Sequence, residues 1–181
     1  MKLNRNLLVY STLAIMILTL SLSGCIGSNG GDMSGVEAAD IVIVEDASGF
    51  EYLGSRAMTV SDVSRQYVEV SDVAGAAEGL YQDANAVDYY IHAIELESSS
   101  AAESFVEQYR ATFRPLSSGE RFAEETFNDH GATRITTYTT EDGTQVARYR
   151  YIWSNENFVI VVGGNSADSA DIRNLAEATG Y

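Results

Sequence analysis

The sequence predicts an α+β fold: an antiparallel sheet with two amphipathic helices packed on one face of it. Two observations predict this fold. Residues 121–162 consist of short runs rich in β-branched and aromatic residues, separated by turn sequences such as Asp142-Gly143, a pattern typical of antiparallel hairpins. Residues 101–113 and 168–179 instead place apolar side chains at the spacing of a helix that is buried on one side. Hairpins combined with two such helices indicate an α+β fold.

The first half of the domain is expected to be mainly extended. Residues 41–44 form a β-branched run and are assigned to the first strand, and residues 50–60 read as a second extended piece. Residues 61–74 fit either a short helix or an irregular strand, whereas the Gly- and Ala-rich residues 75–79 are expected to form a loop. Residues 80–96 predict a hairpin. Because neither face of its second strand is purely polar, we expect that strand near the centre of the sheet.

The helix predicted at 101–113 has clear boundaries. Ser100 and Glu103 match the Ser-x-x-Glu capping box, in which each side chain bonds a free backbone N–H at the start of a helix. Pro115, the only proline, ends the helix because proline lacks the amide hydrogen and its ring clashes with the preceding turn. The residues expected on its buried face are Ala102, Phe105, Val106, Tyr109 and Phe113.

Four strands are predicted between the two helices. They are residues 121–127, 132–139, 144–153 and 158–162. In the third of these strands, the aromatic side chains of Tyr149, Tyr151 and Trp153 share one face. Arg148 and Arg150 lie on the opposite face, where we expect them to pair with carboxylates across the sheet.

The first 24 residues have the organisation of an export signal. Lys2 and Arg5 provide a short basic start, and residues 7–22 form an uncharged run dominated by apolar side chains. A basic region, an apolar region and small residues before a cleavage site are the parts of a secretory signal peptide. Because basic residues stay on the cytoplasmic side, the chain that follows is expected to be exported.

The apolar run closes at Leu22-Ser23-Gly24-Cys25, which holds the only cysteine of the chain. This tetrapeptide resembles the lipobox of secreted lipoproteins, in which an aliphatic residue, a small residue and Gly or Ala precede an obligatory Cys. The resemblance covers residues 1–25 alone. It implies cleavage between Gly24 and Cys25, and attachment of a diacyl-type lipid to the Cys25 sulfur that holds the protein at the outer face of a membrane.

An uncleaved membrane anchor is the alternative. Residues 7–27 are uncharged and, at about 1.5 Å per helical residue, just long enough to cross a bilayer. Both alternatives give the same topology. With the lipobox, the chain divides into a signal peptide at 1–24, a lipidated Cys25 with a flexible tether at 25–39, and one globular domain at 40–181.

The charge of the exported part narrows the range of partners. All 26 acidic residues lie after Cys25, together with nine of the 11 basic residues, all nine of them Arg; the exported net charge is therefore −17. Such a chain repels DNA, RNA and anionic lipid head groups, so nucleic-acid binding is not expected. Because Cys25 is the only cysteine, no disulfide is expected within the exported chain.

No motif indicates catalysis or metal binding. His92 in a predicted strand and His130 in a predicted turn are the only histidines, and neither occurs in a His-Glu-x-x-His pattern. No serine occurs in Gly-x-Ser-x-Gly, and the Gly-Gly-Asn-Ser sequence before the last helix lacks the P-loop lysine. We therefore assign no catalytic residue, no metal ligand and no cofactor.

The aromatic stripe of Tyr149, Tyr151 and Trp153 is the best candidate for ligand contact. Rows of aromatic side chains on an exposed sheet bind apolar or sugar-like ligands and partner proteins. The alternative is that these residues form the core beneath the helices.

The sequence thus predicts a lipid-anchored envelope protein on the extracytoplasmic face of the cell membrane. Its expected role is that of a non-catalytic module that binds a small ligand or another envelope protein. The alternative function is that of a hydrolase or enzyme accessory subunit with a carboxylate-based site.

Overall fold

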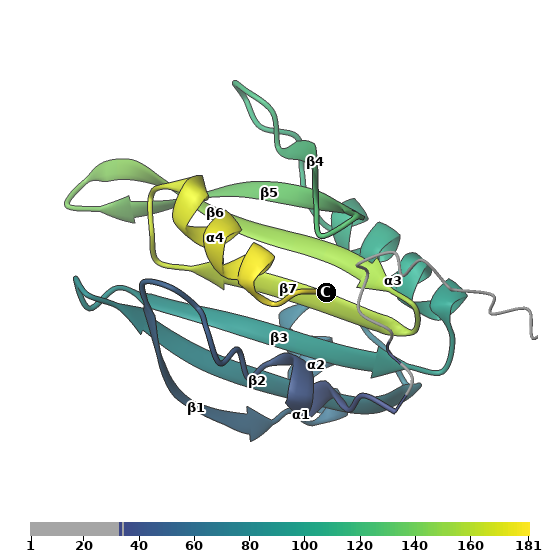
Figure 1. Ribbon diagram of the computed structural model, residues 1–181. Helices are drawn as coiled ribbons and strands as arrows, with labels where there is room; N and C mark the ends of the chain where they lie inside the picture. The colour runs from purple at the N-terminus through teal and green to yellow at the C-terminus, as the bar shows by residue number, and fades with distance from the viewer. Residues whose placement is uncertain (1–32, 34) are drawn as a thin grey trace, which may run out of the picture.

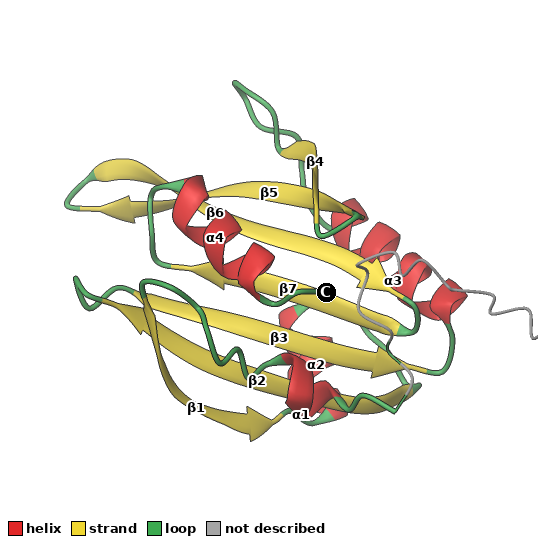
Figure 2. Cartoon of the chain, viewed as in Figure 1, coloured by secondary structure: helices red, strands yellow, loops and turns green. Residues whose placement is uncertain are grey.

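The computed structural model describes residue 33 and residues 35–181. In this part of the chain a seven-stranded antiparallel sheet, in the order β1-β2-β3-β7-β6-β5-β4, is combined with four helices (Figure 1 and Figure 2). The strands are β1 Phe50–Ala57, β2 Val73–Asp83, β3 Asp88–Leu96, β4 Phe122–Phe127, β5 His130–Glu141, β6 Thr144–Asn155 and β7 Phe158–Gly164. The helices are α1 Ala38–Ile41, α2 Val60–Gln66, α3 Ser99–Ala111 and α4 Ser169–Ala178. The predicted α+β class is confirmed.

The predictions for the N-terminal leader lie outside the described residues. They concern the signal peptide at 1–24, the lipobox that ends at Cys25, and most of the tether. None of the helices between residue 33 and residue 181 is both long enough and apolar enough to span a bilayer.

The sheet consists of two runs of antiparallel strands that meet at its centre. β1 to β3 follow one another across one half, and β4 to β7 return from the opposite edge. β3 and β7 join the halves, with Ile91 opposite Val162 and Ala93 opposite Ile160. The four strands predicted over 121–162 agree with β4 to β7 within two residues at each end.

Helices cover both faces of the sheet, which corrects the prediction that both helices pack on one face. Alternate residues of β7 belong to two separate core clusters. Ile160 lies in the cluster that contains Leu175 of α4, and Val161 lies in the cluster that contains Phe105 of α3. α1 shares the face of α4, and α2 shares the face of α3 (Figure 2). The physical reason is that β7 is apolar on both faces, so both have to be removed from water.

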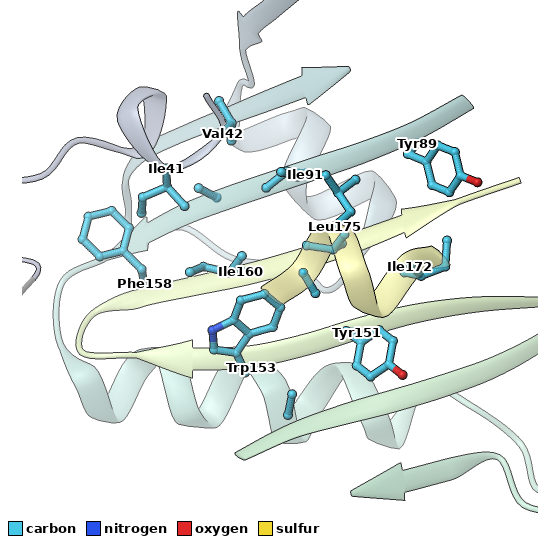
Figure 3. Close-up of a cluster of buried hydrophobic side chains, with 14 of the residues drawn as sticks. Ile41, Val42, Tyr89, Ile91, Tyr151, Trp153, Phe158, Ile160, Ile172 and Leu175 are labelled. Carbon is cyan, nitrogen blue, oxygen red and sulfur yellow. The ribbon is translucent and has the colours of Figure 1, made fainter. Parts of the chain in front are cut away.

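The core on the α1/α4 face is built from large side chains of the central strands. Figure 3 shows Tyr151, Trp153 and Ile160 on the sheet, with Ile172 and Leu175 of α4 packed against them. All five residues are at most 1% exposed. This burial fixes α4 on the sheet through apolar contacts.

The strand predicted at 41–44 is wrong. Its first residue ends α1, and the others follow in a loop, although Ile41 and Val42 are buried. The Tyr81 hydroxyl holds this segment: it donates to the Val42 carbonyl oxygen over 2.7 Å and accepts from the Val44 backbone N–H over 2.8 Å. The β-branched side chains are thus buried without pairing as a strand, which β-propensity alone does not distinguish.

The Gly- and Ala-rich residues 75–79 belong to β2 and not to a loop. A Cβ atom on Gly79 would lie 2.3 Å from the Val42 backbone oxygen. Glycine at this position therefore allows the loop after α1 to approach the sheet closely. The small residues mark a packing contact between two segments, and the sequence interpretation mistook them for a break in the strand.

Side-chain caps define the starts of α2 and α3. The Thr59 hydroxyl accepts from the Asp62 backbone N–H over 3.1 Å, and the Asp62 carboxylate accepts from the Thr59 N–H over 3.0 Å. This capping box begins α2, which covers residues 60–66 and makes the first part of the ambiguous residues 61–74 helical. The predicted helix at 101–113 is confirmed as α3, but its N-cap is Ser98, so it begins two residues earlier than predicted.

Candidate functional site

Two members of the predicted aromatic stripe lie in the core. Tyr151 and Trp153 are each 1% exposed, on the side of the sheet that α4 covers (Figure 3). Tyr149 is partly buried, and the Arg134 guanidinium lies 5.4 Å from its ring centroid. Two of the three residues are thus core, the alternative that the sequence left open, and the stripe does not offer an open ligand surface.

The two histidines are on separate strands. His92 is 2% exposed in β3, whereas His130 begins β5, and β7 and β6 lie between these strands. In the part of the chain that the structure describes, no group of three or more His, Cys, Asp or Glu side chains is placed to hold a metal ion.

A different group of polar side chains gathers on the α2/α3 face. Arg150 of β6 donates to the hydroxyl of Tyr109 in α3. The hydroxyls of Tyr90 in β3 and of Tyr67, directly after α2, lie near enough to act on the pKa of Arg150. The rings of Tyr67 and Tyr109 meet edge to face, with centroids 5.1 Å apart. We call these four residues the arginine–tyrosine site.

The strand register sets the spacing of the arginine–tyrosine site. Leu80, Tyr90, Gly163 and Arg150 are successive neighbours in one row across β2, β3, β7 and β6. A Cβ atom on Gly163 would lie 2.4 Å from the Tyr90 hydroxyl oxygen. The Tyr90 ring therefore lies across Gly163, and its hydroxyl reaches toward Arg150 on the next strand.

Arg150 is a partly buried cation without an acidic partner in the described chain. Six other arginines lie within 4.0 Å of a carboxylate: Arg56, Arg65, Arg110, Arg134, Arg148 and Arg173. Arg148 pairs with Glu141 on β5, as predicted, but the same prediction is wrong for Arg150. Its side chain makes one hydrogen bond with the described residues, from Nη1 to the Tyr109 hydroxyl. Most of its N–H donors remain available to another acceptor.

The tyrosines of the site are neutral donors near neutral pH. Burial raises the pKa of Tyr67, Tyr90 and Tyr109, so their hydroxyls keep their protons. Burial works against the charge of Arg150, whereas the hydrogen bond that its Nη1 donates to the Tyr109 hydroxyl favours the charged form. One fixed positive charge and neutral hydroxyl donors together suit an anion.

A hydrogen-bonded relay of Tyr67, His92 and Glu78 adjoins the site. The Tyr67 hydroxyl bonds to His92 Nδ1, and His92 Nε2 lies 2.9 Å from the Glu78 carboxylate. Because an ionised carboxylate can only accept, Nε2 carries the proton and Nδ1 accepts from Tyr67. The Arg56 Nε donates to the other Glu78 oxygen over 2.5 Å. The relay thereby fixes the orientation of the Tyr67 ring at the edge of the site.

Acidification should destabilise the fold through this relay. Burial lowers the pKa of His92 below its ordinary value of 6.5, although the Glu78 carboxylate opposes the shift. The unfolded chain then binds more protons than the folded one, so stability is lost as the pH falls below about 6.5. The melting temperature of the full-length protein, followed by circular dichroism, should decrease from about pH 7 to about pH 5.

The two histidines provide the control for this pH dependence. His92→Gln should flatten the decrease, because it removes the group that is forced to stay neutral. His130→Gln replaces the other histidine and should leave the decrease in place. An equally steep decrease in His92→Gln would contradict the assignment to the relay.

Sequence reasoning placed Arg150 on its strand and face but missed the rest of the site. Tyr67, Tyr90 and Tyr109 come from separate elements, and only the order β3-β7-β6 brings Tyr90 beside Arg150. The sequence did contain one local signal for the site, which is the position of Arg150 in the middle of a predicted strand. An Arg at such a position either pairs with an acceptor or remains partly buried without one.

Comparison of the chain with protein-family models, with curated proteins and with solved structures found no match. Its function therefore has to be inferred from the site.

Proposed function

We propose that this protein is a lipid-anchored, extracytoplasmic binding module without catalytic activity, and that its arginine–tyrosine site holds a small anionic ligand. One observation carries the proposal: Arg150 has no carboxylate partner among the described residues, although the chain contains 26 acidic residues. A partly buried cation is costly unless an opposite charge compensates it. An anionic ligand at this position would supply that charge.

The hydroxyl of Tyr90 adds a second donor beside Arg150. This hydroxyl makes no hydrogen bond with the described residues. Because Gly163 has no side chain, the Tyr90 ring can lie over it, with the hydroxyl toward the Arg150 guanidinium. Tyr109 is already engaged as the acceptor of the Arg150 hydrogen bond, which fixes the position of the guanidinium. Convergent donors held in place before the ligand arrives favour binding, because little ordering remains to be done.

The carboxylates give little support to the hydrolase alternative. A carboxylic acid that donates a proton at neutral pH needs a raised pKa. Backbone hydrogen bonds instead lower the pKa of Asp62 and Asp83. Burial opposes the same shift at Glu78 and Glu125, but hydrogen bonds and neighbouring arginines outweigh it and lower the pKa of both.

The relay gives equally little support to nucleophilic catalysis. Its terminal hydroxyl belongs to Tyr67, and burial raises the pKa of this residue well above its ordinary value. A nucleophile needs a lowered pKa or a base that accepts its proton, whereas burial also keeps His92 from becoming charged. The relay therefore supports a structural role that holds Tyr67 in place.

The proposed location is supported by the lipobox resemblance of residues 22–25. Mass spectrometry of the protein extracted from membranes should find an N-terminus at Cys25 that carries lipid. A chain that keeps Met1 and a free Cys25 thiol would contradict lipid attachment.

Anion binding can be tested on the full-length protein in a non-ionic detergent, with butyrate as the probe. Saturation-transfer NMR should detect butyrate on the wild-type protein and lose the signal in Arg150→Met. Arg114→Met is the matched control, because Arg114 is exposed and has no carboxylate within 4.0 Å in the described chain. Butyrate binding that persists in a folded Arg150→Met variant would overturn the proposed function.

A further inference from the structure

We infer that the ligand of the arginine–tyrosine site is an amphipathic monocarboxylate, whose carboxylate lies on Arg150 and Tyr90 and whose apolar body extends over Leu80. This inference rests on the proposed function, since it specifies the ligand class of the same site. It draws on the charge of the site, on the row of residues across the sheet, and on the exposure of that row.

The head group follows from the charge balance of the site. Arg150 is its only cation, and the Glu78 carboxylate lies close enough to Tyr90 to act on the pKa of its hydroxyl. One carboxylate balances one guanidinium, whereas a phosphate dianion would leave a net negative charge near Glu78. The exported net charge of −17 would add to that repulsion. The fork of guanidinium N–H donors also matches the two oxygens of a carboxylate.

The apolar body follows from the exposure of the same row of residues. Leu80 is 42% exposed, although it lies on the second strand of the sheet and pairs with Tyr90 of β3. Leu53, at the irregularity where β1 meets Leu80, is 53% exposed. A single exposed leucine needs no explanation. Leu80, however, lies in the row that holds Tyr90 and ends at the Arg150 cation, so this row has an exposed apolar end.

The length of the row limits the size of the ligand. Leu80 and Arg150 are separated by three strand-to-strand steps, which correspond to about 14 Å. The Tyr90 ring lies between them and also packs against His92, with centroids 4.5 Å apart. A medium-chain fatty acid can place its head group on Arg150 and extend its chain over the Tyr90 ring toward Leu80.

A homologous series of carboxylates tests this inference on the full-length protein in a non-ionic detergent. Dissociation constants for acetate, hexanoate and decanoate are measured by saturation-transfer NMR, with protein-free micelles as the blank and with sulfate as a competing dianion. Each added methylene should tighten binding about two- to fourfold. Sulfate should displace hexanoate less well than acetate does at equal ionic strength.

Three variants separate the head group from the apolar body. Leu80→Ser should leave acetate binding unchanged and reduce the gain from chain length. Ile43→Ser is the matched control, because Ile43 is 45% exposed but lies in the loop after α1. Tyr90→Phe removes only the hydroxyl and should weaken acetate and hexanoate by the same factor, about three- to tenfold.

The outcomes distinguish this inference from the proposed function. If acetate binds through Arg150 but longer chains bind no tighter, the anion site stands and the apolar body is refuted. The same conclusion follows if Leu80→Ser retains the full gain from chain length. If sulfate displaces hexanoate at lower concentration than acetate does, the monocarboxylate class is refuted. If no carboxylate binds to the wild-type protein, the inference and the proposed function fail together.

Discussion

Trp153→Ala should destabilise the protein by about 3–5 kcal/mol, because it removes a large side chain that is 1% exposed from the core on the α1/α4 face. The Trp153 ring meets Phe127 edge to face, with centroids 5.2 Å apart, and lies in the cluster that also contains Leu175 of α4. For a domain of this size the melting temperature should fall by roughly 10 °C. Circular dichroism measures the change without relying on the fluorescence of this residue.

Two further variants define the cause of this effect. Trp153→Phe keeps an aromatic ring and removes an Nε1–H that has no hydrogen-bond partner among the described residues, so it should cost less than about 2 kcal/mol. Tyr138→Ala removes an aromatic side chain that is 47% exposed on β5 and should shift the melting temperature little. A Trp153→Ala protein that melts with the wild type would show that this part of the core is assigned wrongly.

Phe105→Ala should cost a similar amount, about 3–5 kcal/mol, on the opposite face of the sheet. Phe105 is 1% exposed on α3 and packs against the Tyr67 ring, with centroids 5.8 Å apart. Its truncation removes apolar contact between α3 and the sheet and also loosens Tyr67 at the edge of the arginine–tyrosine site. Urea unfolding of the full-length protein, followed by circular dichroism, measures the loss.

The control for Phe105 lies on the same helix. Glu107→Ala changes an exposed position of α3 and should stay within about 0.5 kcal/mol of the wild type. If both variants unfold at the same urea concentration as the wild type, α3 does not contribute to the core, and the two-faced packing of the sheet would be refuted.

Local patterns predicted most of the strands in the second half of the chain. Its turns depend on neighbouring residues: Asp142 and Gly143, at the β5–β6 turn, have φ angles of 47° and 79°, the positive values that a tight hairpin turn requires. The strands follow one another in sequence, so their pairing is local as well. Periodicity and turn residues were therefore sufficient to place β4 to β7.

Contacts between distant segments could not be predicted in this way. The β-branched run at 41–44 and the small residues at 75–79 depend on contacts between the loop after α1 and β2, at Gly79 and at the Tyr81 hydroxyl, which no local pattern contains. The arginine–tyrosine site has the same origin, because Gly163 separates Tyr90 from Arg150 only once β7 lies between β3 and β6.

The sequence contained enough information to predict that helices cover both faces of the sheet. Residues 158–162 are apolar throughout, and neither face of the second strand in the hairpin predicted at 80–96 is purely polar. Strands with apolar side chains on both faces require packed elements on each side of the sheet. The two long helices are therefore needed on opposite faces, and the prediction of a single covered face conflicted with its own strand assignments.

The chain enters the domain on the face of the sheet opposite to the arginine–tyrosine site. Met33 is 3% exposed within the core of the α1/α4 face, and the site lies on the reverse face of the sheet. From Cys25 to Met33 the backbone can extend at most about 29 Å. With the lipid proposed at Cys25, this short tether would attach the domain to the membrane from the face of the sheet that does not carry Arg150. The proposed ligand would then reach the arginine–tyrosine site from the surrounding solution and not from the bilayer.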